Sequence, residues 1–338
     1  MNDSTNRALR LGTRRSRLAM SQSGQVAEAV RELTGRPVEL VEITTYGDTS
    51  REHLAQIGGS GVFVSALRDA LLAGEIDFAV HSLKDLPTAQ PEELALAAVP
   101  KREDARDALI ARDGLTFEQL PDGARIGTGS PRRMCQLNAW AKALGKRVET
   151  VPIRGNIDTR IGYVEKGELD AVVLAAAGLS RIGRIDVATQ LLSPDVVLPA
   201  PGQGALAIEC AAVNAALAAQ LAELDDPVTR AAVTAERSLL AALEAGCSAP
   251  VGALADLSPS SRLRSSRGGP KADEQAFTEL HLRGVVGTTD GNTLVHLSTT
   301  GHVPASPDDL STPLNMGREL AAEMLAKGAA GLMGERAL

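Results

Sequence analysis

Hydrophobic and polar positions alternate along the chain in blocks that predict strands followed by helices. Short apolar runs are typical of buried strands, and longer stretches with apolar residues at every third or fourth position are typical of helices that cover a sheet. The predicted strands span residues 8–12, 38–44, 78–82, 125–127, 148–152, 171–175 and 205–210. The predicted helices span 16–33, 62–73 and 227–245, and further helices begin near 130 and 156. This alternation predicts an α/β fold with ligands bound at the strand ends.

The C-terminal third of the chain follows a different pattern. Two alternating runs, 279–286 and 293–299, flank the dipeptide Asp290-Gly291, which is typical of a β-hairpin. A helical pattern covers 314–332, and a stretch rich in Ser, Arg, Gly and Pro covers 257–271. We therefore expect a small α+β domain at this end.

Composition narrows the class of protein. A chain of 338 residues with 44% hydrophobic content can bury two or three ordinary cores, so we expect several globular domains. The net charge of −7, with only four Phe, two Tyr and one Trp, speaks against nucleic-acid binding. The first ten residues are polar, and the longest apolar run, 171–179, is too short to cross a bilayer, so we expect a cytoplasmic protein.

Three cysteines, Cys135, Cys210 and Cys247, lie far apart in the sequence. Neither a CxxC pair nor a Cys/His spacing is present, which argues against a metal site and against a disulfide framework. Cys247 follows a long helical pattern in Glu244-Ala245-Gly246-Cys247, where Gly246 is placed as a helix C-cap. We expect Cys247 on a turn that can present its thiol to a cleft, although a small buried cysteine is the plainer interpretation.

Arginines gather at predicted helix starts. Arg14 to Arg17 precede the first helix, and Arg132 and Arg133 follow Ser130 as N-cap and Pro131 at the first helical position. Free backbone N–H groups and the helix dipole already favour anions there, and guanidinium groups add bidentate binding of carboxylate or phosphate. The pattern predicts a small polyanionic ligand, with solvated basic turns as the alternative.

Three further segments are candidates for a role in the site. Lys84 and Asp85 follow the strand at 78–82, where an α/β sheet binds its ligands, although a solvated ion pair is the plainer alternative. The Gly-rich segment 47–61 is a lid or a plain surface connection, and the Pro- and Gly-rich segment 199–204 is a hinge or a plain linker.

Five motifs stand in order along the chain: H-S-L-K-D-L-P at 81–87, G-T-G-S-P-R-R-M-C-Q-L at 127–137, R-G-N-I-D-T-R at 154–160, P-G-Q-G-A at 201–205 and E-A-G-C at 244–247. Together they resemble one family, hydroxymethylbilane synthase, also called porphobilinogen deaminase. The match runs in order from about residue 9 to residue 252. Departures from the family pattern are Arg17, Tyr46, Ser60 and Gly129, the last of which stands where a hydroxyl residue is frequent.

The resemblance implies a fold and a division into domains. The fold is two α/β domains of the periplasmic-binding-protein type II kind around a cleft, plus a small α+β C-terminal domain. The first domain takes residues 1–103 and 200–224, the second takes 104–199, and the third takes 225–338 and carries the cysteine.

The resemblance also implies an activity. Four porphobilinogen molecules are joined head to tail with loss of ammonia, on a dipyrromethane cofactor held by a thioether to Cys247, and hydroxymethylbilane is released by water. Such an enzyme is a transferase of porphyrin and heme biosynthesis, and we expect a monomer. Asp85 matches the catalytic carboxylate, which stabilises positive charge on pyrrole nitrogens.

Matches to carboxylate-binding positions follow from the same motifs. Those assigned to the cofactor are Lys84, Thr128, Ser130, Arg132, Arg133 and Arg160. Those assigned to the substrate are Arg14, Ser16, Arg154 and Arg181. Loss of Arg132 is expected to impair binding or elongation and to spare folding.

Two rival functions remain at this stage. A two-lobed binding protein for a small polycarboxylate would use the same fold and the same arginines, but it would not need Cys247. A phosphate-handling enzyme would need a G-x-x-x-x-G-K-[ST] loop or paired metal carboxylates, and the sequence has neither.

Overall fold

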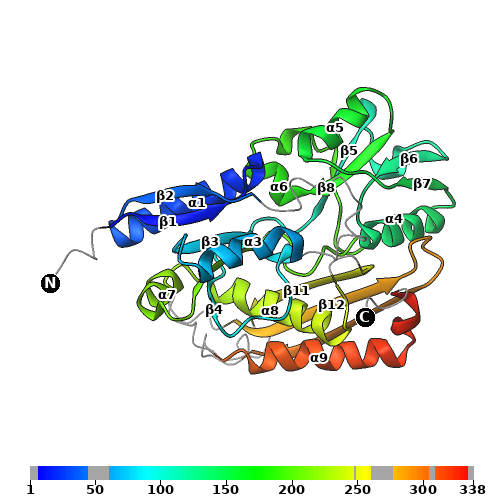
Figure 1. The fold of residues 1–338 in the computed structure, drawn as a ribbon. Helices are drawn as coiled ribbons and strands as arrows, with labels where there is room; N and C mark the ends of the chain where they lie inside the picture. Colours follow the sequence, from blue (N-terminus) through cyan, green and yellow to red (C-terminus); the bar gives the residue numbers. More distant parts are fainter. Residues whose placement is uncertain (1–6, 45–60, 247–248, 260–276, 304–308, 334–338) are drawn as a thin grey trace, which may run out of the picture.

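The computed structural model describes residues 7–44, 61–246, 249–259, 277–303 and 309–333. Its strands form three sheets, two of five strands and one of three. Figure 1 shows the first sheet with the blue and cyan helices, the second with the green helices, and the third beside two long helices in yellow and red. The predicted α/β class, with two α/β sheet regions and a smaller α+β region, is confirmed.

The first sheet combines four strands from the N-terminal 98 residues with one strand at residues 206–211. Its strand order is β2 (Val38–Glu42), β1 (Leu9–Thr13), β3 (Phe78–Ser82), β10 (Leu206–Ala211) and β4 (Leu94–Ala98). The strand β1 runs parallel to β2 and β3, whereas β10 runs antiparallel to β3 and β4. The helices of this part are α1 (Arg17–Thr34), α3 (Gly61–Leu72) and α7 (Ala215–Ala222). The chain therefore leaves this sheet after β4 and returns to its middle with β10.

The second sheet repeats the plan. Its order is β7 (Val148–Val151), β6 (Ala124–Gly127), β8 (Ala171–Ala175), β5 (Asp107–Ala111) and β9 (Gln190–Leu191). Its helices are α4 (Pro131–Ala143), α5 (Ile157–Glu165) and α6 (Ala176–Arg181). Its second strand, β6, is parallel to both neighbours, as β1 is in the first sheet, and β5 is antiparallel to β8. The two sheets place their strand ends and helix starts in equivalent positions.

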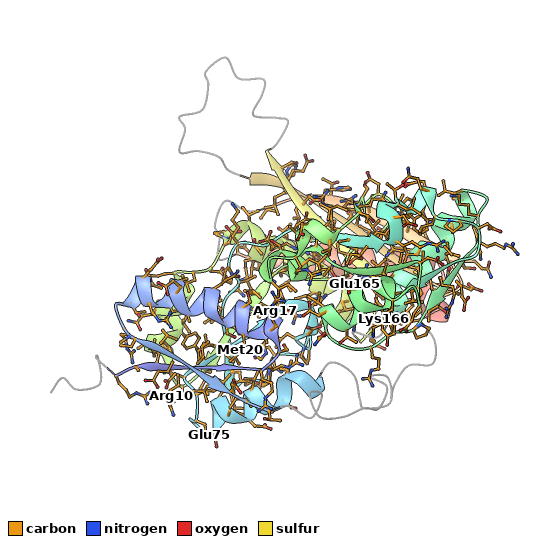
Figure 2. All side chains as sticks on the ribbon, turned by 90° about the horizontal axis from the view of Figure 1, so that it is seen from above. Arg10, Arg17, Met20, Glu75, Glu165 and Lys166 are labelled. Atoms are coloured by element: carbon orange, nitrogen blue, oxygen red, sulfur yellow. The ribbon has the colours of Figure 1, made fainter. Side chains whose placement is uncertain are left out.

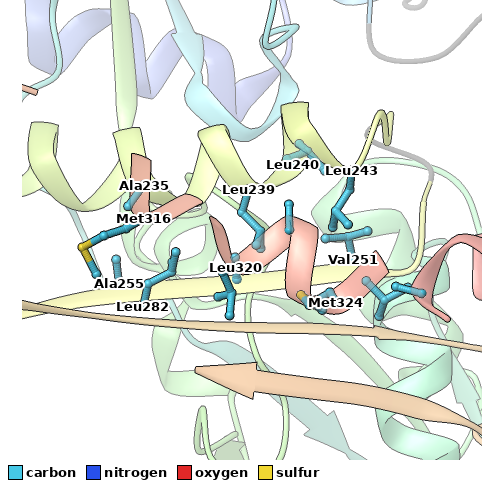
Figure 3. Close-up of a cluster of buried hydrophobic side chains, with 14 of the residues drawn as sticks. Ala235, Leu239, Leu240, Leu243, Val251, Ala255, Leu282, Met316, Leu320 and Met324 are labelled. Carbon is cyan, nitrogen blue, oxygen red and sulfur yellow. The ribbon is translucent and has the colours of Figure 1, made fainter. Parts of the chain in front are cut away.

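The third sheet is an antiparallel meander. It comprises β11 (Val251–Pro259), β12 (Phe277–Gly287) and β13 (Leu294–His302), and α8 (Pro227–Ala242) and α9 (Ser311–Ala326) pack on it. Figure 3 shows Leu239 of α8 with Leu320 and Met324 of α9 in the buried cluster that the two helices form over the strands. Short 3-10 turns complete the chain at Leu83–Asp85 (η1), Arg112–Gly114 (η2), Phe117–Gln119 (η3), Ile185–Val187 (η4) and Ala329–Leu332 (η6).

Local sequence explains where the main helices begin. The side chain of Ser16 accepts a hydrogen bond from the backbone of Ala19 at 3.3 Å, and Asn156 does the same for Thr159 at 2.8 Å. Pro131 and Pro227 occupy first-turn positions, where the missing N–H costs nothing. The predicted helix starts are therefore confirmed.

The sequence analysis identified most elements but not all. The predicted hairpin around Asp290-Gly291 is confirmed as β12 and β13. No element was assigned to β4, to β5 or to α7, because their short apolar segments lie inside charged or Ala-rich stretches. The candidate lid at 47–61 and much of the 257–271 stretch lie outside the described residues. The domain boundaries at 103, 199 and 224 stay predictions.

The connector at 199–204 is tightly built. Gly204 has a φ of +87°, and a Cβ there would lie 2.5 Å from the carbonyl oxygen of Glu103. The carbonyl oxygen of Gly204 accepts hydrogen bonds from the backbone of Glu103 at 3.2 Å and from Arg181 Nη2 at 2.7 Å. These contacts hold the segment in place and speak against a plain linker, whereas the hinge interpretation stays a prediction.

We expect Gly204→Ala to destabilise the protein more than Gly74→Ala. Both glycines have positive φ, so both substitutions carry the left-handed penalty of about 1–2 kcal/mol. Only Gly204 has a backbone oxygen in the way, because nothing lies within 4 Å of a Cβ built at Gly74. The excess for Gly204→Ala should be roughly 1–3 kcal/mol in urea unfolding. Equal losses for the two variants would contradict the close approach.

Candidate active site

A buried carboxylate, Asp107 at the first position of β5, is the centre of the charged cluster. Its Oδ2 accepts a hydrogen bond from Arg132 Nη1 at 2.7 Å, and its Oδ1 accepts one from Arg133 Nη2 at 2.7 Å. Gln203 Nε2 adds a third at 2.8 Å. Burial acts to raise the pKa of Asp107, but the two guanidinium groups outweigh burial and hold that pKa well below its usual range. Asp107 is therefore ionised at neutral pH.

Arg132 and Arg133 are less exposed than a basic helix start would suggest. They are only 3% and 5% exposed, and each also donates to a backbone carbonyl: Arg132 to Leu198 at 2.7 Å and Arg133 to Val173 at 3.0 Å. Within the described chain, Asp107 is the anion that balances the charge of these two arginines at the start of the helix. The sequence analysis expected folding to survive loss of Arg132. The structure gives a physical reason to revise this expectation, because Asp107 would then keep only one of its two guanidinium partners.

Lys84 reaches the same cluster from the first domain. It lies in η1 immediately after β3, and its Nζ is 3.3 Å from Gln203 Oε1. Burial lowers the pKa of Lys84 to about 8, and Arg132 and Arg133 act in the same direction, against Asp85 and Asp107. Gln203 thus connects Lys84 to Asp107, and the sequence analysis assigned it no role.

Positive charge exceeds negative charge in this region. Burial lowers the pKa of Arg160 to about 10, with Arg133 and Arg154 adding to the effect. Five cations therefore interact here, Lys84, Arg132, Arg133, Arg154 and Arg160, together with two carboxylates, Asp85 and Asp107. Bringing like charges together is unfavourable unless an anion is bound. The Nε atoms of Arg132 and Arg133 are also buried without a hydrogen-bond partner among the described residues. The cluster fits a ligand that carries several carboxylates.

The remaining predicted substrate residues lie where α1 meets α6. Ser21 Oγ donates to the carbonyl of Arg181 at 2.6 Å, and Arg17 Nη2 donates to the carbonyl of Ile182 at 3.0 Å. Figure 2 shows Arg17 at the end of α1 that faces the green second domain. Ser16 caps the same helix start, and Arg14 lies two residues before Ser16. Burial lowers the pKa of Arg181, whose guanidinium donates to Gly204.

Thr128 and Ser130 form the turn before α4. Thr128 is fully buried, and its Oγ1 accepts a hydrogen bond from the backbone of Ser130 at 3.2 Å. Ser130 is the N-cap residue, but its side chain makes no capping hydrogen bond. Between them, a Cβ on Gly129 would lie 2.8 Å from the carbonyl oxygen of Ile153. The departure at Gly129 thus accompanies a close approach of the 153–154 backbone to this turn.

Two of the three cysteines are unsuited to nucleophilic chemistry. Cys135 and Cys210 are fully buried. Burial raises the pKa of the Cys135 thiol to about 12, and burial together with Glu209 raises that of Cys210. Both are protonated at neutral pH, and the thiolate is the reactive form. Cys247, the predicted attachment point, lies outside the described residues.

The end of α8 differs from the prediction. Gly246 was placed as the C-cap glycine, and this is wrong: the helix ends at Ala242, and Glu244 takes the left-handed conformation with φ 53°. The backbone of Ala245 donates to Leu240 and that of Glu244 donates to Ala241, at 3.2 and 2.9 Å. These two bonds close a Schellman motif two residues before Gly246.

Neither a membrane span nor a metal centre is found in the described ranges. No helix there is both long and apolar enough to cross a bilayer. No group of three or more His, Cys, Asp or Glu side chains in the same ranges could hold a metal ion.

Two family models match the chain. Residues 9–219 match "Porphobilinogen deaminase, dipyromethane cofactor binding domain", and residues 230–326 match "Porphobilinogen deaminase, C-terminal domain". The chain is 76% identical to porphobilinogen deaminase 1 of Streptomyces avermitilis over 97% of this chain and 98% of the relative. It is 54% identical to porphobilinogen deaminase of Thermobifida fusca, over 95% and 94% respectively. These relatives favour the transferase over the two-lobed binding protein.

Solved structures with a similar outline are distant. The periplasmic VFT2 domain of BvgS from Bordetella pertussis aligns with a TM-score of 0.39 and 14% identity, over 64% of this chain and 86% of that chain. The "probable amino-acid ABC transporter extracellular-binding protein ytmK" from Bacillus subtilis aligns with a TM-score of 0.39 and 10% identity, over 65% of this chain and 90% of that chain. TM-scores this low carry no argument about the fold, which is described from the sheets of this chain alone.

We expect Asp107→Asn to destabilise the protein strongly. The substitution keeps the shape of the side chain but leaves two buried guanidinium groups without a counter-charge, a change that typically costs about 3–5 kcal/mol. The matched control is Asp122→Asn, whose carboxylate pairs with Arg147 at 2.7 Å on the exposed surface. Urea unfolding should show a large loss for the first variant and little change for the second. Similar stabilities would contradict the role of Asp107 as the buried counter-charge.

Proposed function

The chain belongs to the porphobilinogen deaminase family, and we propose how its own residues serve the family's reaction. The enzyme is a transferase of tetrapyrrole biosynthesis that joins porphobilinogen molecules head to tail with loss of ammonia and releases hydroxymethylbilane by hydrolysis. Its cofactor is dipyrromethane, which supplies, when bound, the pyrrole chain that is extended. The assignment of residues to cofactor, substrate and catalysis is our proposal.

The observation that carries the assignment is the excess of cations around Asp107. Porphobilinogen and dipyrromethane carry acetate and propionate groups, so each added unit brings further carboxylates. Lys84, Arg132, Arg133 and Arg160, with the hydroxyl groups of Thr128 and Ser130, are proposed to hold the cofactor. A bound carboxylate would offset the mutual repulsion of these cations and raise the lowered pKa of Lys84.

The second group of residues is proposed to hold the incoming substrate. Arg181 lies between the connector and the first turns of α1, where Arg14 and Ser16 begin the helix. Arg154 precedes α5 and interacts with Arg160, which is assigned to the cofactor. The substrate positions thus adjoin the cofactor positions, as stepwise extension requires.

Asp85 is proposed as the catalytic carboxylate. It lies beside Lys84 in η1, partly exposed, in a region otherwise dominated by positive charge. Positive charge develops on the pyrrole nitrogen of the substrate as ammonia leaves. A carboxylate held next to that nitrogen stabilises the transition state more than the bound ground state.

The setting of the enzyme completes the proposal. We propose that it acts in the cytoplasm as a monomer, with porphobilinogen as its small-molecule partner and without nucleic acid or membrane. The absence of CxxC pairs and of Cys/His metal spacing in the sequence supports a reducing compartment.

Attachment at Cys247 is tested by intact mass. Protein purified from cells that make porphobilinogen should be heavier than the bare chain by one dipyrromethane, and Cys247→Ser should remove the increment. Cys210→Ala is the matched control, because the thiol of Cys210 is buried and protonated, so this variant should keep the increment. An unmodified wild-type chain, or an increment that survives Cys247→Ser, would count against the proposed attachment.

Asp85→Asn tests the catalytic assignment. The variant keeps the size and hydrogen-bonding reach of the side chain and removes its charge, so we expect turnover to fall by about 10²- to 10³-fold. Covalent loading of Cys247 should persist when preformed tetrapyrrole is supplied, which separates chemistry from folding. Asp186→Asn, at an exposed position of the second domain, serves as the control and should turn over normally. Turnover of Asp85→Asn near the wild-type rate would place the catalytic carboxylate elsewhere.

A further inference from the structure

One arginine of the third domain binds the turn that carries Lys84 and Asp85. Arg237 lies on α8, and its Nη1 donates to the carbonyl of Leu86 at 2.8 Å and to that of Leu83 at 3.2 Å. Its Nη2 donates to the carbonyl of Pro87 at 2.7 Å. One guanidinium therefore spans both ends of the short segment in which Asp85 lies.

The turn has few other constraints on its backbone. Leu83 donates to the carbonyl of Ala205 at 3.0 Å, and Leu86 donates to the carbonyl of Leu83 at 3.1 Å. Leu83 and Leu86 are buried, whereas Lys84 and Asp85 between them are only partly buried. A 3-10 turn of three residues has poor internal hydrogen bonding, so side-chain donors to its carbonyls matter for its geometry.

We propose that Arg237 is a positioning residue for the reaction, because it holds residues 83–87 in the conformation that presents Asp85 to the substrate. The proposal rests on the catalytic role proposed for Asp85. Arg237 acts through backbone carbonyls and not through contact with the substrate. A planar guanidinium can bind several carbonyls in fixed directions at once, which a lysine ammonium cannot reproduce.

Glu236, the residue before Arg237, strengthens the geometric argument. It is fully buried and accepts hydrogen bonds from both Nη atoms of Arg102, at 2.6 and 3.0 Å, and from the backbone of Gly202 at 2.7 Å. The helix α8 is thereby fixed against the connector that carries Gln203. Arg237 thus projects from a helix whose position relative to the cleft is already set by a buried ion pair.

Arg230 offers a matched control. It lies seven residues earlier on α8 and therefore on the same helix face. It also joins the helix to the first domain, through contacts of its Nη2 with the carbonyls of Leu96 and Ala97 at 3.4 Å, and it forms an ion pair with Asp225 at 2.8 Å. Among the described residues, no hydrogen bond or ion pair joins it to residues 83–87, so a general loss of packing between α8 and the first domain would affect the two variants alike.

The experiment compares Arg237→Met and Arg230→Met as cofactor-loaded enzymes. Methionine keeps an unbranched apolar stem and removes every donor. We expect Arg237→Met to lower kcat by roughly 10- to 100-fold, the range that misplacement of a catalytic group by about 1 Å can cause, with KM changed little. Arg230→Met should leave kcat near the wild-type value. Equal losses of kcat in the two variants, or a normal kcat in Arg237→Met, would overturn the proposal.

A double variant tests whether Arg237 acts through Asp85. If it does, Arg237→Met should slow Asp85→Asn enzyme much less than it slows the wild type, because the group being positioned is already gone. If the fold-losses of kcat caused by the two single substitutions multiply in the double variant, the two residues act independently and the proposal is overturned. Normal turnover in Asp85→Asn alone would instead contradict the catalytic role of Asp85, so the two failures are told apart by different variants.

A structural readout accompanies the kinetics. Amide hydrogen exchange in residues 83–86 should be faster in Arg237→Met than in wild type and unchanged in Arg230→Met, at temperatures where both variants are folded. Arg237→Lys, which keeps the charge but not the planar fork, should recover only part of kcat and of the protection. Unchanged amide exchange in Arg237→Met would overturn the proposal. A wild-type kcat in Arg237→Lys, together with a loss of kcat in Arg230→Met as large as that in Arg237→Met, would also overturn it.

Discussion

A carboxylate with no access to solvent must be compensated by positive or hydrogen-bonding partners, and that requirement at Asp107 organises the charged cluster. Arg132 and Arg133 come from the first turn of α4, and Gln203 comes from the connector that leads back to the first sheet. Gln203 also contacts Lys84 in the turn after β3. One buried charge therefore joins segments of both mixed-sheet domains, and a change at Asp107 affects all of them.

A second buried carboxylate, Glu236, does for the third domain what Asp107 does for the other two. It binds Arg102 and the backbone of Gly202, and its Oε1 also accepts a hydrogen bond from the backbone of Ala255 at 2.9 Å. Arg102 in turn donates to the carbonyl of Gln203 at 2.7 Å. The α+β domain is thus tied to the same connector by directional polar contacts, which fix its orientation more closely than apolar packing does.

The electrostatics of this charged cluster fit the binding of polycarboxylates by an acidic chain. The net charge is −7, yet five cations interact around two carboxylates near the strand ends. Burial, with neighbouring guanidinium groups, lowers the pKa values of Lys84 and Arg160. Carboxylates bound at the proposed site would relieve the repulsion between these cations, so part of its electrostatic cost in the folded protein would contribute to ligand affinity.

The sequence by itself determined two things about this protein: its local structure at helix starts and turns, and the family to which it belongs. Ser16, Asn156 and the Pro-Gly connector specify helix starts and turns through neighbours within a few residues, and the five motifs identify the family. Tertiary structure alone decided which arginines are compensated and by what. Asp107 lies 25 residues from Arg132 and 96 from Gln203, and no periodic pattern encodes such pairings. The same holds for Arg237 and its carbonyls about 150 residues away, because backbone acceptors carry no sequence signal and become partners only when folding brings them together.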